Sequence, residues 1–132
     1  MTPDQQKKAA VDFMLALDRG DEKALSEMTA PNFIFELMTP IPGSLGTLQR
    51  EEFLNTLPKM LRTLLPKGFN FKFEYPIADG PHVSLQGTCD TTTFAGKKYN
   101  NRYHWYFRFS GDKLEHAREY FDSYHTAQVM SP

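Results

Sequence analysis

The chain has 132 residues and a formal net charge of -1, from 15 lysines and arginines against 16 aspartates and glutamates. This length fits a single domain spanning residues 1–132 and excludes a second large one. The balanced charge provides no field that would gather nucleic acid or an anionic membrane surface, so neither is an expected partner. Aromatic residues make up 14% of the sequence, more than a disordered chain carries, and indicate a large core or a pocket.

The single cysteine and the polar start of the chain indicate the compartment. Cys89 has no second cysteine with which to form an internal disulfide, and residues 1–8 lack the apolar core of a signal peptide. No apolar run approaches the ~20 residues of a membrane span. We therefore expect a cytoplasmic protein in which Cys89 is a small buried hydrophobic residue.

The first thirty residues predict two helices. Thr2 and Gln5 have the spacing of a capping box, and Gly20 supplies a left-handed stop, so the first helix should run from Thr2 to the residue before Gly20. Asp21 can cap a second, shorter helix that should end before Pro31. The apolar stripe of the first helix, at i, i+3, i+4 and i+7, consists of Ala10, Phe13, Met14 and Leu17.

A strand and a third helix should follow. Residues 32–39 read as a strand, and the prolines and glycines of residues 40–46 indicate a loop. The third helix is expected from about Leu48 to Leu65, with a bend at Pro58, which deletes one backbone hydrogen bond. Its apolar period is carried by Phe53, Leu57, Met60, Leu61 and Leu64.

The rest of the chain should be sheet. From Phe69 to Tyr75 apolar and polar residues alternate, which is typical of a half-buried strand. Turn signals divide the remainder into strands expected near 82–94, 98–109 and 113–124. Their short connections require antiparallel neighbours. The order of elements predicts an α+β protein whose helices cover one face of a curved antiparallel sheet.

The last third of the chain carries a distinctive motif. Residues 96–109 read Gly-Lys-Lys-Tyr-Asn-Asn-Arg-Tyr-His-Trp-Tyr-Phe-Arg-Phe, and they precede Asp-Lys-Leu at 112–114 and Arg-Glu-Tyr-Phe-Asp at 118–122. This pattern resembles the SnoaL-like branch of the nuclear-transport-factor-2-like (NTF2-like) superfamily, which includes ketosteroid isomerases, polyketide cyclases and limonene epoxide hydrolases. Asp112 stands where the family turn has glycine. The resemblance implies a cone in which the curved sheet and three helices of the N-terminal half enclose a pocket.

The resemblance also implies which side chains face the pocket. Alternation along the last two strands points a set of residues inward, namely Asn101, Tyr103, Trp105, Phe107, Ala117, Glu119 and Phe121. The intervening residues should face out, namely Arg102, His104, Tyr106, Arg108, His116, Arg118 and Tyr120. The outer face of the sheet is expected to form a homodimer.

Glu119 is the candidate general base, because the epoxide hydrolase and cyclase branches place their catalytic acidic residue at this position. Aromatic neighbours would strip the carboxylate of water, raise its pKa and suit it to removing a proton or activating water. The alternative is a β-bulge that turns Glu119 to the outer face, into a salt bridge with Arg118 or Arg102.

Other catalytic groups of the family are largely missing. Alignment with the epoxide hydrolases puts Gly87 and Cys89 at the arginine and the acid, with Asp90, one residue away, as a candidate second acid. Their water-holding positions fall at Phe35 and Leu37. Alignment with the ketosteroid isomerases puts Leu37, beside Glu36, at the base and Trp105 at the oxyanion-hole acid. The cyclases' polar pair maps to Tyr103 and Trp105, whose O–H and N–H are candidate donors to an enolate oxygen.

The histidines do not form a metal-binding pattern. None of the four, His82, His104, His116 and His125, has a histidine partner at helical spacing. We therefore expect no metal site, and the resemblance implies no cofactor.

Together these features predict a small-molecule enzyme that uses general-base chemistry on a hydrophobic or carbonyl-bearing substrate. Isomerisation, cyclisation, dehydration and hydrolysis remain open. The expected catalytic residues are Glu119, Tyr103 and Trp105. The expected substrate-binding residues are Phe35, Leu37, Asn101, Phe107, Ala117 and Phe121. The alternative is a non-catalytic dimeric module that binds a ligand or a protein, because the second catalytic group is missing.

Overall fold

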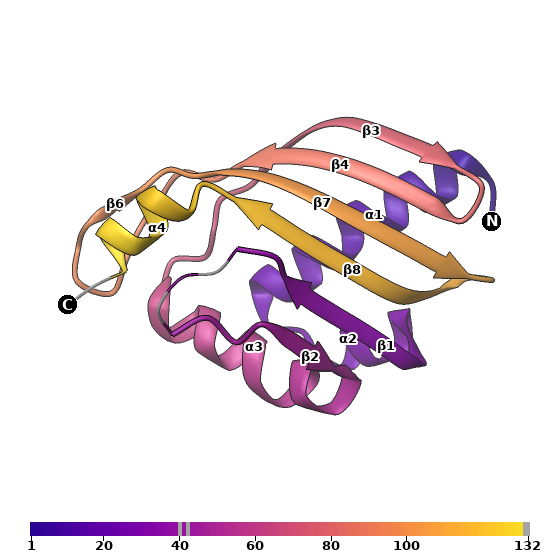
Figure 1. The fold of residues 1–132 in the computed structure, drawn as a ribbon, viewed down its shortest axis with the longest axis horizontal. Coiled ribbons are helices and arrows are strands. Elements are labelled where there is room, and N and C mark those ends of the chain that lie inside the picture. Colours follow the sequence, from indigo (N-terminus) through magenta and orange to yellow (C-terminus); the bar gives the residue numbers. More distant parts are fainter. Residues whose placement is uncertain (40, 42, 131–132) are drawn as a thin grey trace.

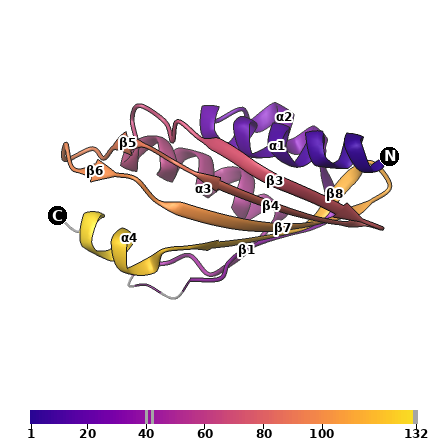
Figure 2. The same cartoon turned by 90° about the horizontal axis from the view of Figure 1, so that it is seen from above.

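A computed structural model describes residues 1–39, 41 and 43–130 of the chain. Its main body is a six-stranded curved sheet, crossed on one face by three helices and extended at one end by a fourth (Figure 1). Figure 2 shows the first three helices, α1 to α3, on the same side of the sheet. The α+β architecture expected from the sequence is confirmed.

The first two helices begin and end as the capping residues predict. Helix α1 covers Pro3–Arg19, with both hydrogen bonds of the Thr2–Gln5 capping box and Gly20 at φ 69°. Helix α2 covers Glu22–Met28. The Asp21 side chain caps it by accepting a hydrogen bond from the backbone N–H of Ala24.

The next segment differs from the prediction at its edges. Strand β1 covers Thr29–Leu37, so it begins directly after α2 and earlier than the predicted residue 32. A short strand, β2, covers Thr47–Gln49, where a loop and the start of a helix were predicted. Helix α3 then covers Arg50–Leu64 with Pro58 inside it. The predicted loop prolines at positions 40 and 42 lie outside the described residues.

Four principal strands and a small ribbon follow. Strand β3 covers Lys72–Asp79, β4 His82–Thr88, β7 Arg102–Ser110 and β8 Lys113–Phe121, while β5 Thr91–Thr92 and β6 Lys98–Tyr99 form a separate two-stranded ribbon. The predicted strands 82–94 and 98–109 are therefore each interrupted. The strand predicted from Phe69 starts only at Lys72, since Asn70 adopts φ 56°.

The C-terminal segment was predicted incorrectly as a continuation of the last strand to residue 124. Strand β8 instead ends at Phe121, and helix α4 covers Ser123–Val129. The cause is Asp122, whose carboxylate accepts a hydrogen bond from the backbone N–H of His125 and thereby caps the helix.

The strand order is β2-β1-β8-β7-β4-β3. The meander β3-β4-β7-β8 is antiparallel. Short turns require this for the pairs β3–β4 and β7–β8, whereas β4 and β7 are joined through the β5–β6 ribbon. Strand β1, in contrast, pairs in parallel with β8. Most of the chain lies between these two strands, so no short connection constrains their direction. The pairing places Leu37 of β1 and Trp105 of β7 on either side of Glu119 in β8.

Aromatic side chains join the helices to the inner face of the sheet. Phe13 of α1 stacks on Phe53 of α3, with ring centroids 5.8 Å apart, and meets Phe107 of β7 edge-on at 5.9 Å. The core is therefore filled beneath α1. The opposite end of the cone, beneath α3 and α4, holds the cavity described below.

Candidate functional site

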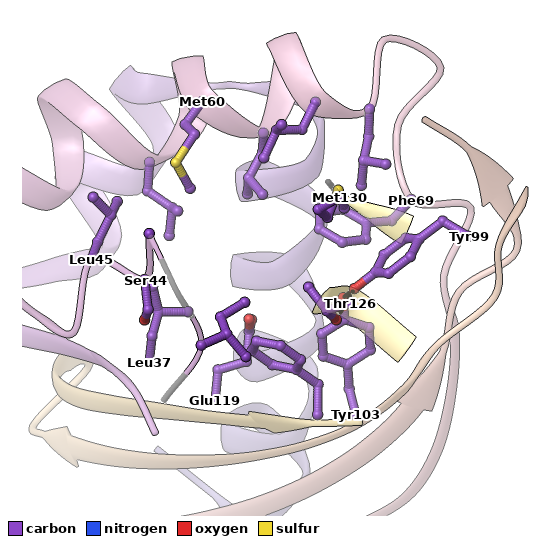
Figure 3. Close-up of a pocket in the computed structure, with 17 residues that line it drawn as sticks. Leu37, Ser44, Leu45, Met60, Phe69, Tyr99, Tyr103, Glu119, Thr126 and Met130 are labelled. Atoms are coloured by element: carbon purple, nitrogen blue, oxygen red, sulfur yellow. Dashed lines mark hydrogen bonds between the residues drawn. The ribbon is translucent and has the colours of Figure 1, made fainter. Parts of the chain in front are cut away.

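A cavity of about 310 Å³ lies between the sheet, α3 and α4 (Figure 3). Its floor comes from β1, β7 and β8, and its roof comes from α3, from which Met60 points towards the floor. The lining residues in the described part of the chain are Leu37, Ile41, Gly43, Ser44, Leu45, Leu57, Met60, Leu61, Leu64, Leu65, Phe69, Tyr99, Tyr103, Glu119, Phe121, Thr126 and Met130. Leucine, methionine and aromatic side chains dominate this lining, and Glu119 is the one charged residue among the described positions.

Glu119 stands on the inner face of β8 and points into the cavity (Figure 3). Glu119 is 9% exposed. The register shift between β7 and β8 lies between Arg108 and Phe109, so no bulge turns Glu119 to the outer face. Burial raises the pKa of Glu119 to about 7, and a hydrogen bond from Trp105 acts in the opposite direction. The group therefore exchanges a proton near neutral pH, which suits a general base or acid.

Trp105 holds the carboxyl group from behind. Its indole Nε1–H donates to Glu119 Oε2 at 3.0 Å, and the ring is fully buried and does not border the cavity. The ring occupies the space over Gly87, where a Cβ atom would lie 2.9 Å from Trp105 Cζ3. An arginine at position 87, which the epoxide hydrolase alignment would require, would need the volume that the indole fills.

Hydroxyl groups gather at the α4 end of the cavity. The phenol oxygens of Tyr99 and Tyr103 are 2.6 Å apart, and Tyr99 Oη is 3.2 Å from Thr126 Oγ1. Asn101 stands behind them and donates from Nδ2 to Thr126 Oγ1 at 2.8 Å and to Tyr99 Oη at 3.0 Å. Figure 3 shows Tyr99, Tyr103 and Thr126 converging on this end of the space. Burial raises the pKa of both phenols, so both remain neutral.

The structure brings together only part of the predicted site. The cavity is lined by Leu37, Tyr103, Glu119 and Phe121. The remaining candidates lie buried outside its lining, namely Phe35, Asn101, Trp105, Phe107 and Ala117.

Asp90, the candidate second acid, is an exposed surface residue and not part of the cavity. Its side chain is 62% exposed and forms an ion pair with Lys98 at 2.6 Å. It belongs to a shallow polar surface hollow and does not line the cavity. Shifting the epoxide hydrolase alignment by one residue, from Cys89 to Asp90, therefore does not place a second acid beside Glu119.

Sequence reasoning missed the residues contributed by α4. Thr126 and Met130 line the cavity, but the last strand was predicted to run to residue 124 and no element was predicted after it, so neither was a candidate. Tyr99 lies inside the family motif but was assigned no role. The α3 residues Met60 and Leu57 belong to the helical apolar period, which predicted burial without indicating that they face a cavity.

The described residues contain no group of three histidine, cysteine, aspartate or glutamate side chains that could hold a metal ion. His104 and His82 lie on the outer face, in hydrogen bonds with Ser84 at 2.7 Å and Tyr106 at 2.6 Å. His116 also faces outward but is 8% exposed, because Glu36 and the ring of Tyr106 cover it.

Within residues 1–39, 41 and 43–130, no helix is long and apolar enough to cross a membrane. Burial raises the pKa of the Cys89 thiol to about 11, and the residue is 3% exposed. The thiol is thus a poor nucleophile at neutral pH.

Comparison with known proteins agrees with the fold and the motif. The family model described as "SnoaL-like domain" matches residues 10–117, so the chain belongs to the SnoaL-like domain family. No curated protein sequence matches the chain.

Solved structures show the same NTF2-like fold. An NTF2-like protein of unknown function from Burkholderia pseudomallei has a TM-score of 0.84 at 16% identity, with 100% of each chain covered. An LEH-like epoxide hydrolase from M. tuberculosis has a TM-score of 0.75 at 17% identity, covering 96% of this chain and 89% of that one. TerC, co-crystallised with polyporic acid, has a TM-score of 0.80 at 15% identity, covering 96% and 98%.

Proposed function

We propose that the protein is an enzyme that moves protons on a small, uncharged, carbonyl-bearing molecule, with Glu119 as the general base. The observation that carries this proposal is a carboxyl group that faces an apolar cavity and has a pKa of about 7. Burying a carboxyl group among leucines and aromatic rings costs stability. A perturbed titratable group in a cleft is a marker of function.

The cavity supports an uncharged ligand of modest size. Among the described lining residues there is no lysine, arginine or histidine to pair with a carboxylate or a phosphate. An apolar cavity of about 150 Å³ holds one benzene molecule, so a volume of about 310 Å³ suits a molecule of about two fused rings.

The proposed chemistry uses two groups, the Glu119 carboxylate and the Tyr103 hydroxyl. The Glu119 carboxylate removes a proton from the carbon next to the substrate carbonyl, and the electron pair of that C–H bond moves to the carbonyl oxygen as an enolate forms. We assign the donor to this oxygen to the Tyr103 hydroxyl, because Tyr103 lines the cavity. Return of the proton to a carbon completes an isomerisation. In a cyclisation, the enolate carbon instead forms a C–C bond to a second carbonyl carbon, and the oxygen of that carbonyl takes up the proton from Glu119 to give an alcohol.

For Trp105 we propose a role different from the one that the cyclase alignment implies. Because its N–H is already bound to Glu119 Oε2, we propose that it positions the base rather than donating to the substrate. Asn101 likewise acts through Tyr99. Leu37 and Phe121 remain proposed as substrate-binding residues, since both line the cavity. Their neighbours in the core would support them from behind.

The test is hydrogen–deuterium exchange into enolisable bicyclic ketones, followed by proton NMR. Wild-type protein should accelerate exchange at the carbon next to the carbonyl. Glu119→Gln should lower the rate roughly 10²- to 10⁴-fold, the range typical for loss of a general base. Glu27→Gln, which removes an exposed carboxylate from α2, is the matched control and should exchange like wild type.

The same assay separates an enzyme from a non-catalytic binding module. A module predicts ligand binding without accelerated exchange, and a Glu119→Gln variant that binds an apolar ligand at least as tightly. Exchange by wild type that persists in Glu119→Gln would refute Glu119 as the base.

We also propose that two copies pair through the outer face of the sheet and that the protein works in the cytoplasm. The outer face carries large, partly exposed side chains, among them Tyr120 at 42% and Ile34 at 36%. A broad patch of this kind is commonly covered by a partner. The buried free thiol of Cys89 suits a reducing compartment.

A further inference from the structure

The hydroxyl groups at the α4 end of the cavity can donate their hydrogen bonds in more than one direction. This inference rests on the proposed function only in assuming that the cavity holds a ligand. Three hydroxyl groups, those of Tyr103, Tyr99 and Thr126, form a chain that begins at the cavity wall. Each hydroxyl has one hydrogen to donate and can also accept. The direction of donation along the chain therefore decides what Tyr103 offers to a ligand.

Asn101 anchors one side of this chain in a fixed orientation. Its Oδ1 accepts from the backbone N–H of Arg102 at 2.7 Å and of Asp122 at 3.3 Å. The amide cannot be turned over without facing its NH₂ group against these two donors. Nδ2 therefore faces Tyr99, Thr126 and the backbone oxygen of Asp122 as a donor, and neither hydroxyl group can donate its hydrogen to it.

The remaining hydrogens have two complete arrangements. Thr126 donates to the backbone oxygen of Asp122 at 3.2 Å in both. In the first, Tyr99 donates to Tyr103, and the Tyr103 hydrogen is left for a ligand. In the second, Tyr103 donates to Tyr99 and Tyr99 donates to Thr126, so Tyr103 offers a lone pair. The Cys89 thiol also interacts with the Tyr103 hydroxyl, but sulfur is a weak acceptor.

We propose that the Tyr103–Tyr99–Thr126 chain is a reversible hydrogen-bond switch, which lets the cavity bind two-ring ligands that present either an acceptor or a donor to Tyr103. A ketone takes the first arrangement, and a ligand N–H or an enol O–H takes the second. The two states interconvert by rotation of two hydroxyl groups, with no movement of the backbone. The switch thus accommodates both the carbonyl form of a substrate and its enol form.

Thr126 is the positioning residue of the switch because it is the second acceptor for the Tyr99 hydrogen. Thr126→Val keeps the shape of the side chain and removes the hydroxyl. Asn101 Nδ2 then still has two acceptors, Tyr99 Oη and the backbone oxygen of Asp122 at 3.2 Å, so no buried donor is orphaned. Among the described residues, Tyr103 is then the one remaining acceptor for the Tyr99 hydrogen, which fixes the chain in the arrangement that suits a ketone.

The experiment measures the dissociation constants of two rigid probes by calorimetry. One probe is 1-indanone, whose carbonyl only accepts, and the other is indole, whose N–H only donates. At pH 5 Glu119 holds its proton, since its pKa is about 7, and so offers indole no carboxylate. Thr126→Val should weaken the binding of indole roughly 3- to 10-fold, which corresponds to about one net hydrogen bond. The dissociation constant of 1-indanone should change by less than about 2-fold. Tyr103→Phe should weaken both probes.

If Thr126 had a merely structural role, Thr126→Val would change the dissociation constants of both probes by the same factor. Thr126→Ser restores the hydroxyl and should restore the affinity for indole. Equal effects of Thr126→Val on the two probes, no effect on indole, or no binding of either probe to wild type would overturn the inference. The exchange assay with Glu119→Gln is independent of these measurements. Absent exchange with intact probe selectivity would refute only the proposed function, and exchange without selectivity would refute only the switch.

Discussion

The raised pKa of Glu119 comes from a shortage of polar neighbours rather than from a nearby charge. Burial raises its pKa, and a single neutral hydrogen bond, from Trp105, moves it in the opposite direction. The family resemblance, carried along the alternating residues of the last strand, implied that this residue faces inward, and the residue is buried in the structure. Alternation did not reveal that Trp105 serves the base, because whether an indole N–H meets a substrate or a carboxylate depends on cross-strand register.

The hydrogen bond from Trp105 makes a testable contribution at this scale. Trp105→Phe removes the N–H donor that stabilises the charged carboxylate, so the pKa of Glu119 should rise further. The midpoint of the kcat/KM profile for ketone exchange should move to higher pH, while the rate at alkaline pH stays within about tenfold of wild type. An unshifted midpoint would show that the indole does not act on the base.

The same carboxyl group should make stability depend on pH. Its folded-state pKa, about 7, lies above its ordinary value of 4.5, so the stabilising effect of the neutral form is complete below about pH 4.5 and is lost as the pH rises through 7. Glu119→Gln should therefore match wild type in urea unfolding at pH 4.5 and exceed it at pH 8 by up to about 3 kcal/mol. A difference that does not grow with pH would contradict the burial of the charge.

At the scale of elements, strand β4 is shaped to receive the indole. Gly87 faces the Trp105 ring, and a Cβ atom there would also lie 3.0 Å from the backbone oxygen of Lys72 in β3. The sequence alone does not distinguish a glycine required by a neighbouring ring from one that simply fills a strand. It likewise predicts α1 from its caps but misses α4, whose seven residues carry no apolar stripe.

Gly87→Ala should consequently destabilise the protein by about 1–3 kcal/mol, the usual cost of overfilling a packed core. It should also lower the exchange rate, because a displaced indole no longer holds Glu119. Gln86→Ala, on the exposed face of the same strand, is the control and should leave both quantities close to wild type. Equal melting temperatures for the two variants would mean that the space above Gly87 is not needed.

At the scale of the molecule, the two ends of the cone differ in packing. Beneath α1 the aromatic rings form a solid core, and beneath α3 and α4 the same sheet lines a cavity. Helix periods and strand alternation predicted the layers, but neither gives the direction of β1 against β8. That pairing joins segments about eighty residues apart, and it places Leu37 beside Glu119.

The outer face of this sheet should pair two copies of the chain. Light scattering at tens of micromolar should give twice the 15.2 kDa chain mass, and Tyr120→Glu should lower it, because a charge at this half-exposed position opposes contact between two sheets. A monomeric mass for wild type would contradict the dimer without affecting the cavity.

The proposed chemistry depends most on the protonation state of the Glu119 carboxyl group. Carbon-13 NMR of protein labelled at the glutamate side-chain carboxyls, with Glu119→Gln to assign the signal, follows its titration directly. We predict a midpoint near 7 for Glu119, well above the ordinary value of 4.5. A midpoint near 4.5 would show that the carboxyl group is hydrated and charged throughout the neutral range, and would remove Glu119 as the buried general base.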